Sequence, residues 1–481
     1  MRPMNIRTKI VVTIGPQNAG SGSLKTLYDA GMSVVRLNGS HNSFDWHAET
    51  ILRVKHDLPD VPIIFDLPGR KIRTQRIEEP LVVNEGGFIT LTTAKDSKER
   101  GVVLIDSSNL HEKVSLGQDI FADDGTLKFR VERVEGQNIV LRSRSNGFLG
   151  NNKGINIPKL DMGPVVLTDV DKDFLEFARK LEIDFIGLSF VESRDHVELY
   201  RDYFKSGWTP KIISKIENYS GFQNLEDIVC SSDGIMIDRG DLSVETDLES
   251  VILRQKVICR TGNRLSKPVI VATEMLHTMI NFPTPTKAEV GDVTNAVLDG
   301  CAATMLSGET AVGRFPVESV QMMQGIIAHT ENFFENETRK LGQKTAEDDE
   351  NNHEVTIAKA IDLICRSIQV TKIVAITRNG HAARSLSSLG GTVPIIGVSD
   401  IEANSRSFNL YKGVLGVHFP AKFASVDVSH VPAVLKFLWD SGLIISTDRI
   451  LVTALAYPVS GNRMNLIETH IVSDLVSALK W

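Results

Sequence analysis

Residues 211–243, KIISKIENYSGFQNLEDIVCSSDGIMIDRGDLS, contain two short apolar runs that each end in charge. Residues 212–216 are followed by Glu217, and residues 234–237 are followed by a charged segment that includes Asp241. Ile-rich runs of this length are typical of β-strands, and apolar character on both faces is typical of a parallel sheet. The stretch therefore predicts two strands of a parallel sheet that end in charged side chains.

A lysine inside the first run requires an explanation. In a strand, Lys215 and Glu217 are two residues apart and point to the same side. A buried cation beside a carboxylate, with Asp241 to follow, suits a divalent metal and a transferred phosphoryl group. A structural ion pair at the end of a strand explains the pattern equally well, so this stretch alone leaves both interpretations open.

The composition limits the classes of protein. The chain of 481 residues is long enough for several domains, and its net charge of −7 argues against a general nucleic-acid or anionic-membrane binder. The four cysteines show no CxxC spacing, which fits a reducing compartment without structural zinc. No apolar run approaches the roughly 18 residues of a membrane-spanning helix, and residues 1–9 lack the apolar segment of a signal peptide. We therefore expect a cytoplasmic protein without nucleic-acid or membrane partners.

Apolar strand candidates alternate with amphipathic helical patterns along much of the chain. Nearly every strand candidate ends in a polar or charged residue: 9–15, 34–37, 63–65, 185–188, 212–216, 234–237, 269–272 and 303–306. Helical patterns lie between them, for example at 24–30, 169–181, 248–261 and 288–298. Eightfold β/α alternation is the pattern of a closed parallel barrel, whose active site lies at the carboxyl ends of its strands. The competing fold, an open doubly wound sheet, usually carries a glycine-rich phosphate loop that is missing here.

The connection after the third strand is too long for a simple crossover. Residues 71–165 contain short alternating runs rich in Val, Ile, Thr and Phe, with turn signals at Asp124-Gly125 and Glu135-Gly136. This pattern predicts a small β-barrel domain inserted into the larger barrel, and an insertion over the catalytic end is placed to act as a lid. The expected fold class is therefore α/β, a (β/α)8 TIM barrel formed by residues 1–70 and 166–339 with an inserted domain.

The remainder of the chain has a different character. Residues 340–353 are polar and aperiodic, which predicts a linker. A helix at 355–368 and strands at 372–377, 393–398 and 449–454 predict a C-terminal α/β domain over residues 354–481, with a regulatory or oligomerisation role.

Nine segments, in this order, resemble the pyruvate kinase family: TKIVVTIGP (8–16), VVRLNGSH (34–41), FADDG (121–125), NNKGINIP (151–158), ISKIEN (213–218), GIMIDRGDLS (234–243), VIVATEML (269–276), PTPTKAEVGDVTNAVLDG (283–300) and MLSGETAVGRFPVE (305–318). The resemblance extends over nearly the whole chain. It implies a phosphotransferase that moves the phosphoryl group of phosphoenolpyruvate to ADP in glycolysis, giving pyruvate and ATP. It also implies Mg²⁺ or Mn²⁺ as the cofactor and a homotetramer.

The resemblance also implies roles for single residues, of types that suit phosphoryl transfer. The catalytic residues would be Lys215, Arg36 and Thr273. The substrate would be bound by Arg36, Ser189, Lys215, Gly240, Asp241 and Thr273. The Mg²⁺ ion would be held by Glu217 and Asp241. The nucleotide would meet Asn38, His41, Arg73 and Lys153, with Asp123 or Asp124 contributed by the lid.

Some of these residues have plain structural interpretations. The Thr273 hydroxyl could bond to backbone at a strand end, and His41 and Lys153 could lie in ordinary loops. Asp123 and Asp124 before a glycine could form a hairpin turn. These alternatives stay open at the level of the sequence.

The residues of a monovalent-cation site are altered. Asn38, Ser40 and Asp66 match the residues that hold K⁺ in K⁺-dependent members of the family, but Lys71 stands where those members have a glutamate. A lysine ammonium offers one positive charge and three donors, much as a bound K⁺ offers one charge. The resemblance therefore implies a vestigial site in which Lys71 is the surrogate, so that K⁺ is not required.

Other departures leave the activity to be tested. Gly39, Asp238 and Glu274 stand where phenylalanine, alanine and glutamine are usual, and Asp238 adds a carboxylate near the substrate. The loop TRNGHAARS (377–385) has fewer hydroxyls than the loop that holds a sugar bisphosphate in activated members, which predicts weak activation or none. The alternatives are a divergent pyruvate kinase-like paralogue and a lyase of the phosphoenolpyruvate/pyruvate barrel type. Lyases of that type lack the inserted domain and the nucleotide site.

Overall fold

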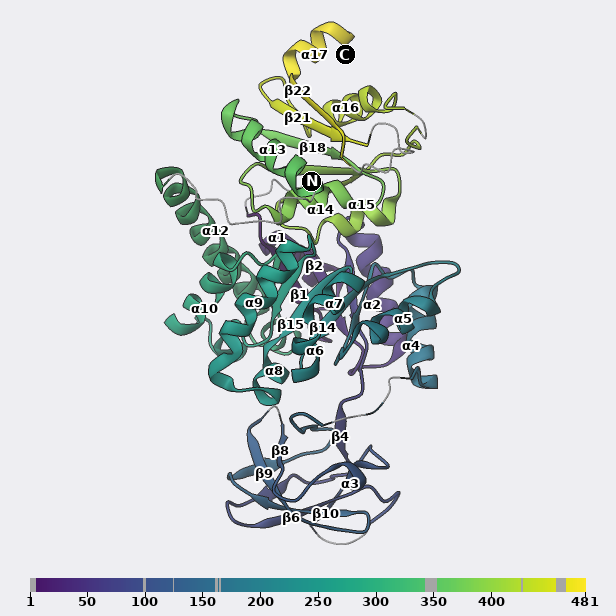
Figure 1. The fold of residues 1–481 in the computed structure, drawn as a ribbon, viewed down its shortest axis with the longest axis vertical. Coiled ribbons are helices and arrows are strands. Elements are labelled where there is room, and N and C mark those ends of the chain that lie inside the picture. The colour runs from purple at the N-terminus through teal and green to yellow at the C-terminus, as the bar shows by residue number, and fades with distance from the viewer. Residues whose placement is uncertain are drawn as a thin grey trace.

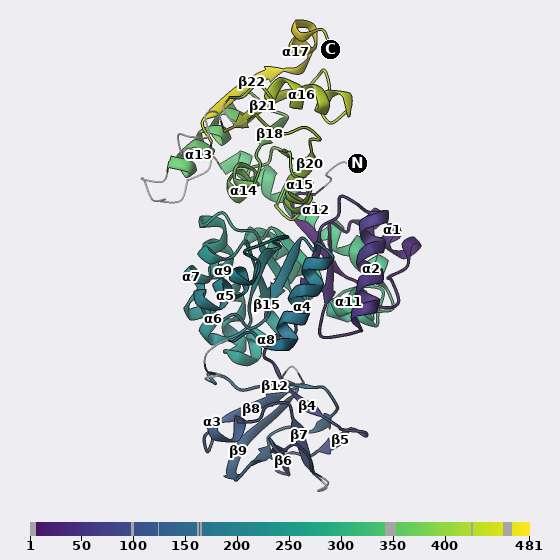
Figure 2. The same cartoon turned by 90° about the vertical axis from the view of Figure 1, so that its right-hand side faces the viewer.

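The computed structural model describes residues 6–97, 101–123, 125–160, 163, 166–341, 353–424, 427–455 and 464–481. The inserted domain, the large barrel and the C-terminal domain follow one another along the longest axis of the molecule (Figures 1 and 2). Asp124, named above as a possible lid residue, and most of the predicted linker lie outside the described residues.

The eight predicted strands close into one parallel barrel, in the order β1-β17-β16-β15-β14-β13-β3-β2. Their bounds are β1 (Lys9–Thr13), β2 (Val34–Asn38), β3 (Ile63–Asp66), β13 (Phe185–Leu188), β14 (Lys211–Ile216), β15 (Gly234–Asp238), β16 (Val269–Ala272) and β17 (Ala303–Leu306). The predicted (β/α)8 barrel is confirmed, and the open sheet was the wrong alternative. All eight carboxyl ends therefore face the same end of the barrel.

Helices surround this barrel: α1 (Ser21–Ala30), α2 (Phe44–Asp57), α4 (Asp169–Lys180), α5 (Arg194–Tyr203), α6 (Tyr219–Gln223), α7 (Leu225–Ser231), α8 (Arg239–Glu245), α9 (Val251–Arg264), α10 (Lys287–Leu298), α11 (Gly308–Ala311) and α12 (Pro316–Leu341). Local sequence explains where several of them begin. Thr168 and Thr286 form reciprocal capping boxes with Asp171 and Glu289 at the starts of α4 and α10. The four helical patterns predicted between strands are all confirmed.

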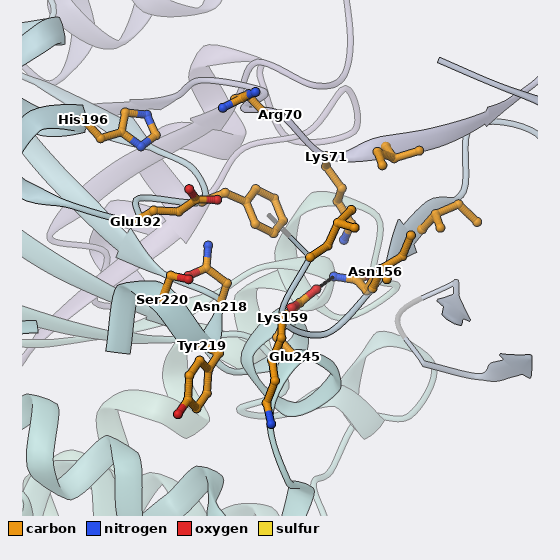
Figure 3. Close-up of a pocket in the computed structure, with 15 residues that line it drawn as sticks. Arg70, Lys71, Asn156, Lys159, Glu192, His196, Asn218, Tyr219, Ser220 and Glu245 are labelled. Atoms are coloured by element: carbon orange, nitrogen blue, oxygen red, sulfur yellow. Dashed lines mark hydrogen bonds between the residues drawn. The ribbon is translucent and has the colours of Figure 1, made fainter. Parts of the chain in front are cut away.

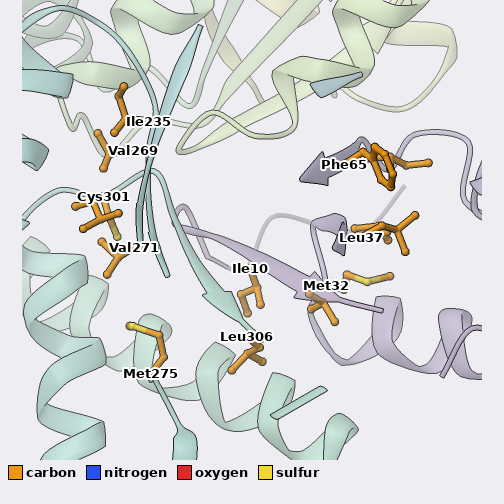
Figure 4. Packing of buried hydrophobic residues seen from close by; sticks show 14 of the residues in the cluster. Ile10, Met32, Leu37, Phe65, Ile235, Val269, Val271, Met275, Cys301 and Leu306 are labelled. Carbon is orange, nitrogen blue, oxygen red and sulfur yellow. The ribbon is translucent and has the colours of Figure 1, made fainter. Parts of the chain in front are cut away.

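Alternation along the strands divides the apolar side chains between two cores. Ile10 and Val12 belong to the cluster between the strands and the surrounding helices, which also contains Phe65 and Leu306 (Figure 4). Val11, between them, belongs to the cluster inside the barrel. This alternation is the period-two geometry of a strand, and burial on both faces explains why the barrel strands read as continuous apolar runs.

The inserted domain is a second closed barrel, with strand order β10-β6-β7-β4-β12-β8-β9, joined by a small sheet of β5 and β11. Its elements are β4 (Ile72–Gln75), β5 (Leu81–Val83), β6 (Phe88–Thr92), β7 (Val102–Ile105), α3 (Leu110–Lys113), β8 (Asp119–Ala122), β9 (Leu127–Glu135), β10 (Asn138–Ser143), β11 (Gly147–Leu149) and β12 (Gly154–Asn156). It has its own apolar cluster, centred on residues such as Leu91 and Phe129. The predicted inserted β-barrel is confirmed.

The C-terminal domain is a five-stranded sheet in the order β20-β19-β18-β21-β22, covered by helices. Its elements are α13 (His353–Ser367), β18 (Lys372–Ile376), α14 (His381–Ser388), β19 (Ile395–Ser399), α15 (Glu402–Phe408), β20 (Val414–His418), α16 (Val431–Asp440), β21 (Arg449–Ala454), β22 (Leu466–Ile471) and α17 (Val472–Leu479). The predicted α/β class is confirmed. The sequence analysis identified three of these strands and missed β20 and β22.

This domain docks on the amino ends of the barrel strands. The Lys9 ammonium, at the start of β1, donates to the Val414 carbonyl at 2.7 Å, and Lys211, at the start of β14, donates to Asn404 Oδ1 at 2.9 Å. The Arg406 Nε atom lies 2.7 Å from Asp184 Oδ1, just before β13. The carboxyl ends of the strands are thus left to face the inserted domain.

No helix in the described part of the chain is long and apolar enough to cross a membrane.

Candidate active site at the carboxyl end of the barrel

Lys215 lies at the centre of a buried polar cluster that is formed at the ends of four strands, β3, β13, β14 and β15. Its ammonium is 2.6 Å from Glu217 Oε1, 3.4 Å from Asp238 Oδ2 and 3.6 Å from Asp66 Oδ2. It also donates to Ser189 Oγ at 3.3 Å. Burial opposes the charge of Lys215, but the three carboxylates outweigh burial and raise its pKa above the ordinary value. The ammonium is therefore held as a fixed cation.

Three carboxylates of this cluster could hold a divalent cation. Glu217, Asp238 and Asp241 each offer an oxygen within 4.8 Å of the other two. Mg²⁺ binds hard oxygen ligands at about 2.0–2.1 Å, so opposite ligands on one ion are about 4.2 Å apart. These oxygens fit a common Mg²⁺ or Mn²⁺ ion after small side-chain adjustments. Two of them, Glu217 and Asp241, are the ligands that the sequence analysis named.

The ionisation of these carboxylates reflects their burial. Glu217 is 1% exposed, and burial, with Asp238 and Asp241 nearby, raises its pKa although Lys215 opposes that shift. Burial also raises the pKa of Asp241, against the effect of Lys71. The pKa of Asp238 is lowered, because Lys215, Lys71 and Arg36 together outweigh its burial. A divalent cation would favour the charged form of all three.

Arg36 enters the cluster from the end of β2. Its Nη2 and Nε atoms lie 2.8 and 3.2 Å from Asp66 Oδ2, and its Nη1 atom donates to Thr13 Oγ1 at 3.3 Å. The other oxygen of Asp66 is buried without a hydrogen bond, and a Cβ at Gly187 would lie 2.1 Å from it. Asp66 thus orients Arg36. Residue 187 must be a glycine because a side chain there would clash with Asp66.

Thr273 and Glu274 form a strained turn after β16. Their φ angles are +65° and +55°, a region that residues with side chains rarely adopt. The buried Arg239 stabilises the turn by donating to the Thr273 carbonyl at 2.8 Å while it is paired with Asp292 at 2.7 Å. Strain that is held by neighbouring contacts is common at functional sites.

The Thr273 hydroxyl is set in a hydrogen-bond network by this turn. It accepts from the Gly240 N–H at 2.9 Å, and its single proton is shared between the Ala272 carbonyl at 2.7 Å and Asp238 Oδ1 at 3.2 Å. The Gly240 N–H, predicted to meet substrate, is therefore engaged by Thr273 in this structure.

Lys71 crosses from the inserted domain to the barrel. Its ammonium lies 2.6 Å from Asp241 Oδ1, and its stem passes over Gly154, where a Cβ would lie 2.2 Å from Lys71 Cε. Asn156 donates to the same Asp241 oxygen at 3.1 Å and to Glu245 at 3.3 Å. Lys71, Asn156 and Glu245 line a pocket between the two domains, where they point toward one another (Figure 3). The predicted K⁺ surrogate thus reaches a predicted Mg²⁺ ligand.

The residues predicted to bind nucleotide lie outside the contacts of the buried cluster. The pKa of His41 is lowered by partial burial and then by the nearby charges of Arg73 and Arg36. Lys153 is paired with Asp123 at 2.7 Å. Asn38 accepts from the Ser40 N–H at 3.1 Å, an interaction within its own loop.

The structure therefore brings one group of the predicted residues together and leaves the others apart. The buried group contains Arg36, Asp66, Ser189, Lys215, Glu217, Asp241 and Thr273. The others remain in smaller sets: Asn38 with Ser40, His41 near Arg73 and Arg36, and Lys153 with Asp123 in the inserted domain.

Three contributors were missed or undervalued by the sequence analysis. Asp238 was noted only as a departure, although it ends a strand as the other site residues do. Arg239 follows it and was given no role. Asn156 was given no role, although it lies in the segment NNKGINIP, because it acts from the inserted domain across 85 positions of sequence.

Comparisons with known proteins bear on this geometry. The family model described as pyruvate kinase, barrel domain, matches residues 5–320, and the model described as pyruvate kinase, alpha/beta domain, matches residues 355–470. The chain is 34% identical to the pyruvate kinase of Geobacillus stearothermophilus, over 98% of this chain and 82% of that protein. It is 33% identical to the pyruvate kinase of Borreliella burgdorferi, over 96% of this chain and 95% of that protein. It is also 34% identical to the pyruvate kinase of Thermococcus litoralis, over 93% and 94% of the two chains.

Proposed function

The chain belongs to the pyruvate kinase family, and from this premise we propose that its buried cluster transfers the phosphoryl group of phosphoenolpyruvate to ADP. The observation that carries the proposal is Lys215, a buried ammonium at the end of β14 among three carboxylates. Phosphoryl transfer depends mainly on positioned charge rather than on covalent catalysis. This cluster supplies positioned charge of both signs.

The geometry supports a separate role for each charged residue of the cluster. Glu217 and Asp241 would hold the Mg²⁺ or Mn²⁺ ion, which when bound neutralises charge on the phosphoryl oxygens. Arg36, oriented by Asp66, binds the phosphoryl group. Lys215 stabilises the negative charge that develops as the bond between phosphorus and the enolate oxygen breaks and a bond to the terminal phosphate of ADP forms.

The enolate left by this transfer needs a proton to become pyruvate. The Thr273 hydroxyl is positioned by the strained turn to orient the water or the proton that completes the reaction. Ser189, which holds Lys215, and the Gly240 N–H would bind the substrate, the latter after release from Thr273. Asn38, His41, Arg73 and Lys153 would meet the nucleotide as the inserted domain closes.

Pyruvate formation with each reactant omitted in turn tests this function. We expect turnover only when phosphoenolpyruvate, ADP and a divalent cation are all present. A barrel lyase would release product without ADP, and an inactive paralogue would give no turnover in the complete mixture.

We also propose that the enzyme works without K⁺, because the Lys71 ammonium is a tethered charge in the same polar cluster. The Lys71 ammonium is paired with Asp241 and already adds a positive charge to the cluster. A second cation about 4 Å from it would be repelled by roughly 4 kcal/mol at an effective dielectric near 20. The rate should be nearly equal in K⁺ and in tetramethylammonium. Lys71→Glu should lower the rate in tetramethylammonium and recover part of it in K⁺. If the unmodified enzyme loses most of its rate without K⁺, Lys71 is not the surrogate.

Fructose 1,6-bisphosphate should activate weakly or not at all. In the loop after β18 the guanidinium of Arg378 is already held by Asp400, at 3.1 and 3.2 Å from Nε and 3.0 Å from Nη2. The Asp400 carboxylate, 4% exposed, also accepts the Phe423 N–H, so the chain's own anion occupies these donors. The activation is measured as the change in rate when fructose 1,6-bisphosphate is titrated at sub-saturating phosphoenolpyruvate. A large, saturable rise in rate would contradict it, and Asp400→Asn should increase any response.

The homotetramer and the cytoplasmic location expected above stay proposals. Exposed apolar side chains on one group of helices support contact with a second copy of the chain, among them Leu253, Val257, Leu298, Phe333 and Phe334. The four cysteines are all free, as expected in a reducing compartment.

A further inference from the structure

Asp238 differs from Glu217 and Asp241, the other two possible ligands of the divalent cation, in the distance to its nearest ammonium. Glu217 and Asp241 each have a lysine ammonium at 2.6 Å, from Lys215 and Lys71 respectively. The closest cation to Asp238 is Lys215, 3.4 Å from Oδ2, and its other oxygen accepts a long hydrogen bond of 3.2 Å from Thr273. A cation that enters the cluster must displace an ammonium from Glu217 or from Asp241. At Asp238 it meets only the longer 3.4 Å contact with Lys215, so less has to be displaced there.

The charges of the cluster point the same way. Its cations and anions are Arg36, Lys71, Lys215, Asp66, Glu217, Asp238 and Asp241. With all of these ionised, the four carboxylates exceed the three cations by one charge. Without Asp238, the cluster would be neutral before any cation arrived. Asp238 therefore supplies the excess negative charge that attracts a divalent cation to the substrate-free protein.

We propose that Asp238 is a third ligand of the divalent cation and its first point of attachment, which lets the cation bind before the substrate. This inference rests on the proposed function, because it concerns the same cation. It adds a residue whose carboxylate is not among the two metal ligands predicted from the sequence. Its position is compatible with the role, because Asp238 is the last residue of β15, at the carboxyl end of the barrel, and its side chain is 12% exposed, as is that of Asp241.

The Asp238 carboxylate should also weaken the binding of phosphoenolpyruvate. Phosphoenolpyruvate is an anion that binds beside the cation, so a third carboxylate repels it. Asp238 should therefore strengthen binding of the cation and weaken binding of the substrate. A residue with a purely structural role would not move these two quantities in opposite directions.

The test is a titration of the full-length protein with Mn²⁺ alone, followed by electron paramagnetic resonance and calorimetry. The unmodified protein should bind one Mn²⁺ per chain without substrate. Asp238→Asn keeps the shape of the side chain and an acceptor for Thr273, but removes the charge. It should weaken Mn²⁺ binding about 10- to 100-fold, the range expected when a group that tunes a metal site is removed. At saturating Mn²⁺ the same variant should show a lower KM for phosphoenolpyruvate.

The matched control is Glu192→Gln, which removes a carboxylate that lines the pocket between the domains outside this cluster. Its Mn²⁺ affinity should stay within about twofold of the unmodified protein. The proposal is overturned if Asp238→Asn binds Mn²⁺ as tightly as the unmodified protein. It is also overturned, without any variant, if the unmodified protein binds no Mn²⁺ until phosphoenolpyruvate is added.

The result for Glu217→Gln separates this proposal from the proposed function. Loss of Mn²⁺ binding in Glu217→Gln together with normal binding in Asp238→Asn would overturn the role of Asp238 and leave the function standing. Normal binding in both variants would overturn the role of Asp238 and the assignment of Glu217 as a ligand, and the omission of single reactants would still test the proposed function separately.

Discussion

Lys215→Met is expected to lose at least a hundredfold to a thousandfold of the rate of phosphoryl transfer. The ammonium lies among three carboxylates, and no other described cation is within 4 Å of Glu217. Removal of one preorganised charge from a water-poor site costs about 3–4 kcal/mol of transition-state stabilisation. Single-turnover measurement of ATP formation reports this step directly.

Lys211→Met is the matched control for this variant. Lys211 begins the strand that carries Lys215, but its ammonium bonds to Asn404 at the opposite end of the barrel. Its rate should stay within about twofold of the unmodified enzyme. Because Lys215→Met leaves buried carboxylates without their cation, its thermal unfolding must be compared with that of the unmodified protein. A folded Lys215→Met with a near-normal rate would exclude Lys215 from catalysis.

Glu217→Gln is expected to remove most of the Mg²⁺-dependent turnover. The substitution keeps the size of the side chain but replaces an anionic ligand of the cation with a neutral amide. It also removes the anion 2.6 Å from Lys215, so that both charges of the pair change together. Saturation with Mg²⁺ should restore only a small part of the rate. Glu226→Gln, an exposed position on α7, is the control and should behave as the unmodified enzyme.

Glu217 also predicts a pH dependence of Mg²⁺ binding. Its pKa is raised by burial and by nearby carboxylates, so part of the population is protonated near neutral pH in the absence of a cation. A protonated carboxyl cannot serve as an anionic ligand, and the affinity for Mg²⁺ should therefore fall as the pH is lowered from 8 to 6. Glu217→Gln should bind weakly throughout and lack this part of the pH dependence. Calorimetric titration at several pH values, without substrate, checks both statements.

The sequence by itself determined the barrel and the centre of its site. Continuous apolar runs that end in charge specify buried parallel strands, and a period of two places Lys215 and Glu217 on one side of β14. Both properties are local, so they can be recognised from the sequence of a single strand.

The two strands that the sequence analysis missed, β20 and β22, show where prediction from local sequence fails. β22 alternates between half-buried and exposed residues along LIETHI, because it pairs with β21 alone at the edge of its sheet and never forms an apolar run. β20 is interrupted by Gly416, where a Cβ would lie 1.8 Å from the Ser405 carbonyl oxygen. The glycine is required by the approach of α15, a tertiary contact that its own strand does not reveal.

Only the tertiary structure decided the charge balance of the site. Lys71 reaches Asp241 across 170 positions of sequence, and Arg36 reaches Asp66 across 30. The strained φ of Thr273 depends on Arg239, 34 positions away. Each strand ends in a polar residue for local reasons, but which charges become neighbours depends on barrel closure and on where the inserted domain docks. The physical reason is that electrostatic energy depends on distance in space and on burial, and the order of residues along the chain fixes neither.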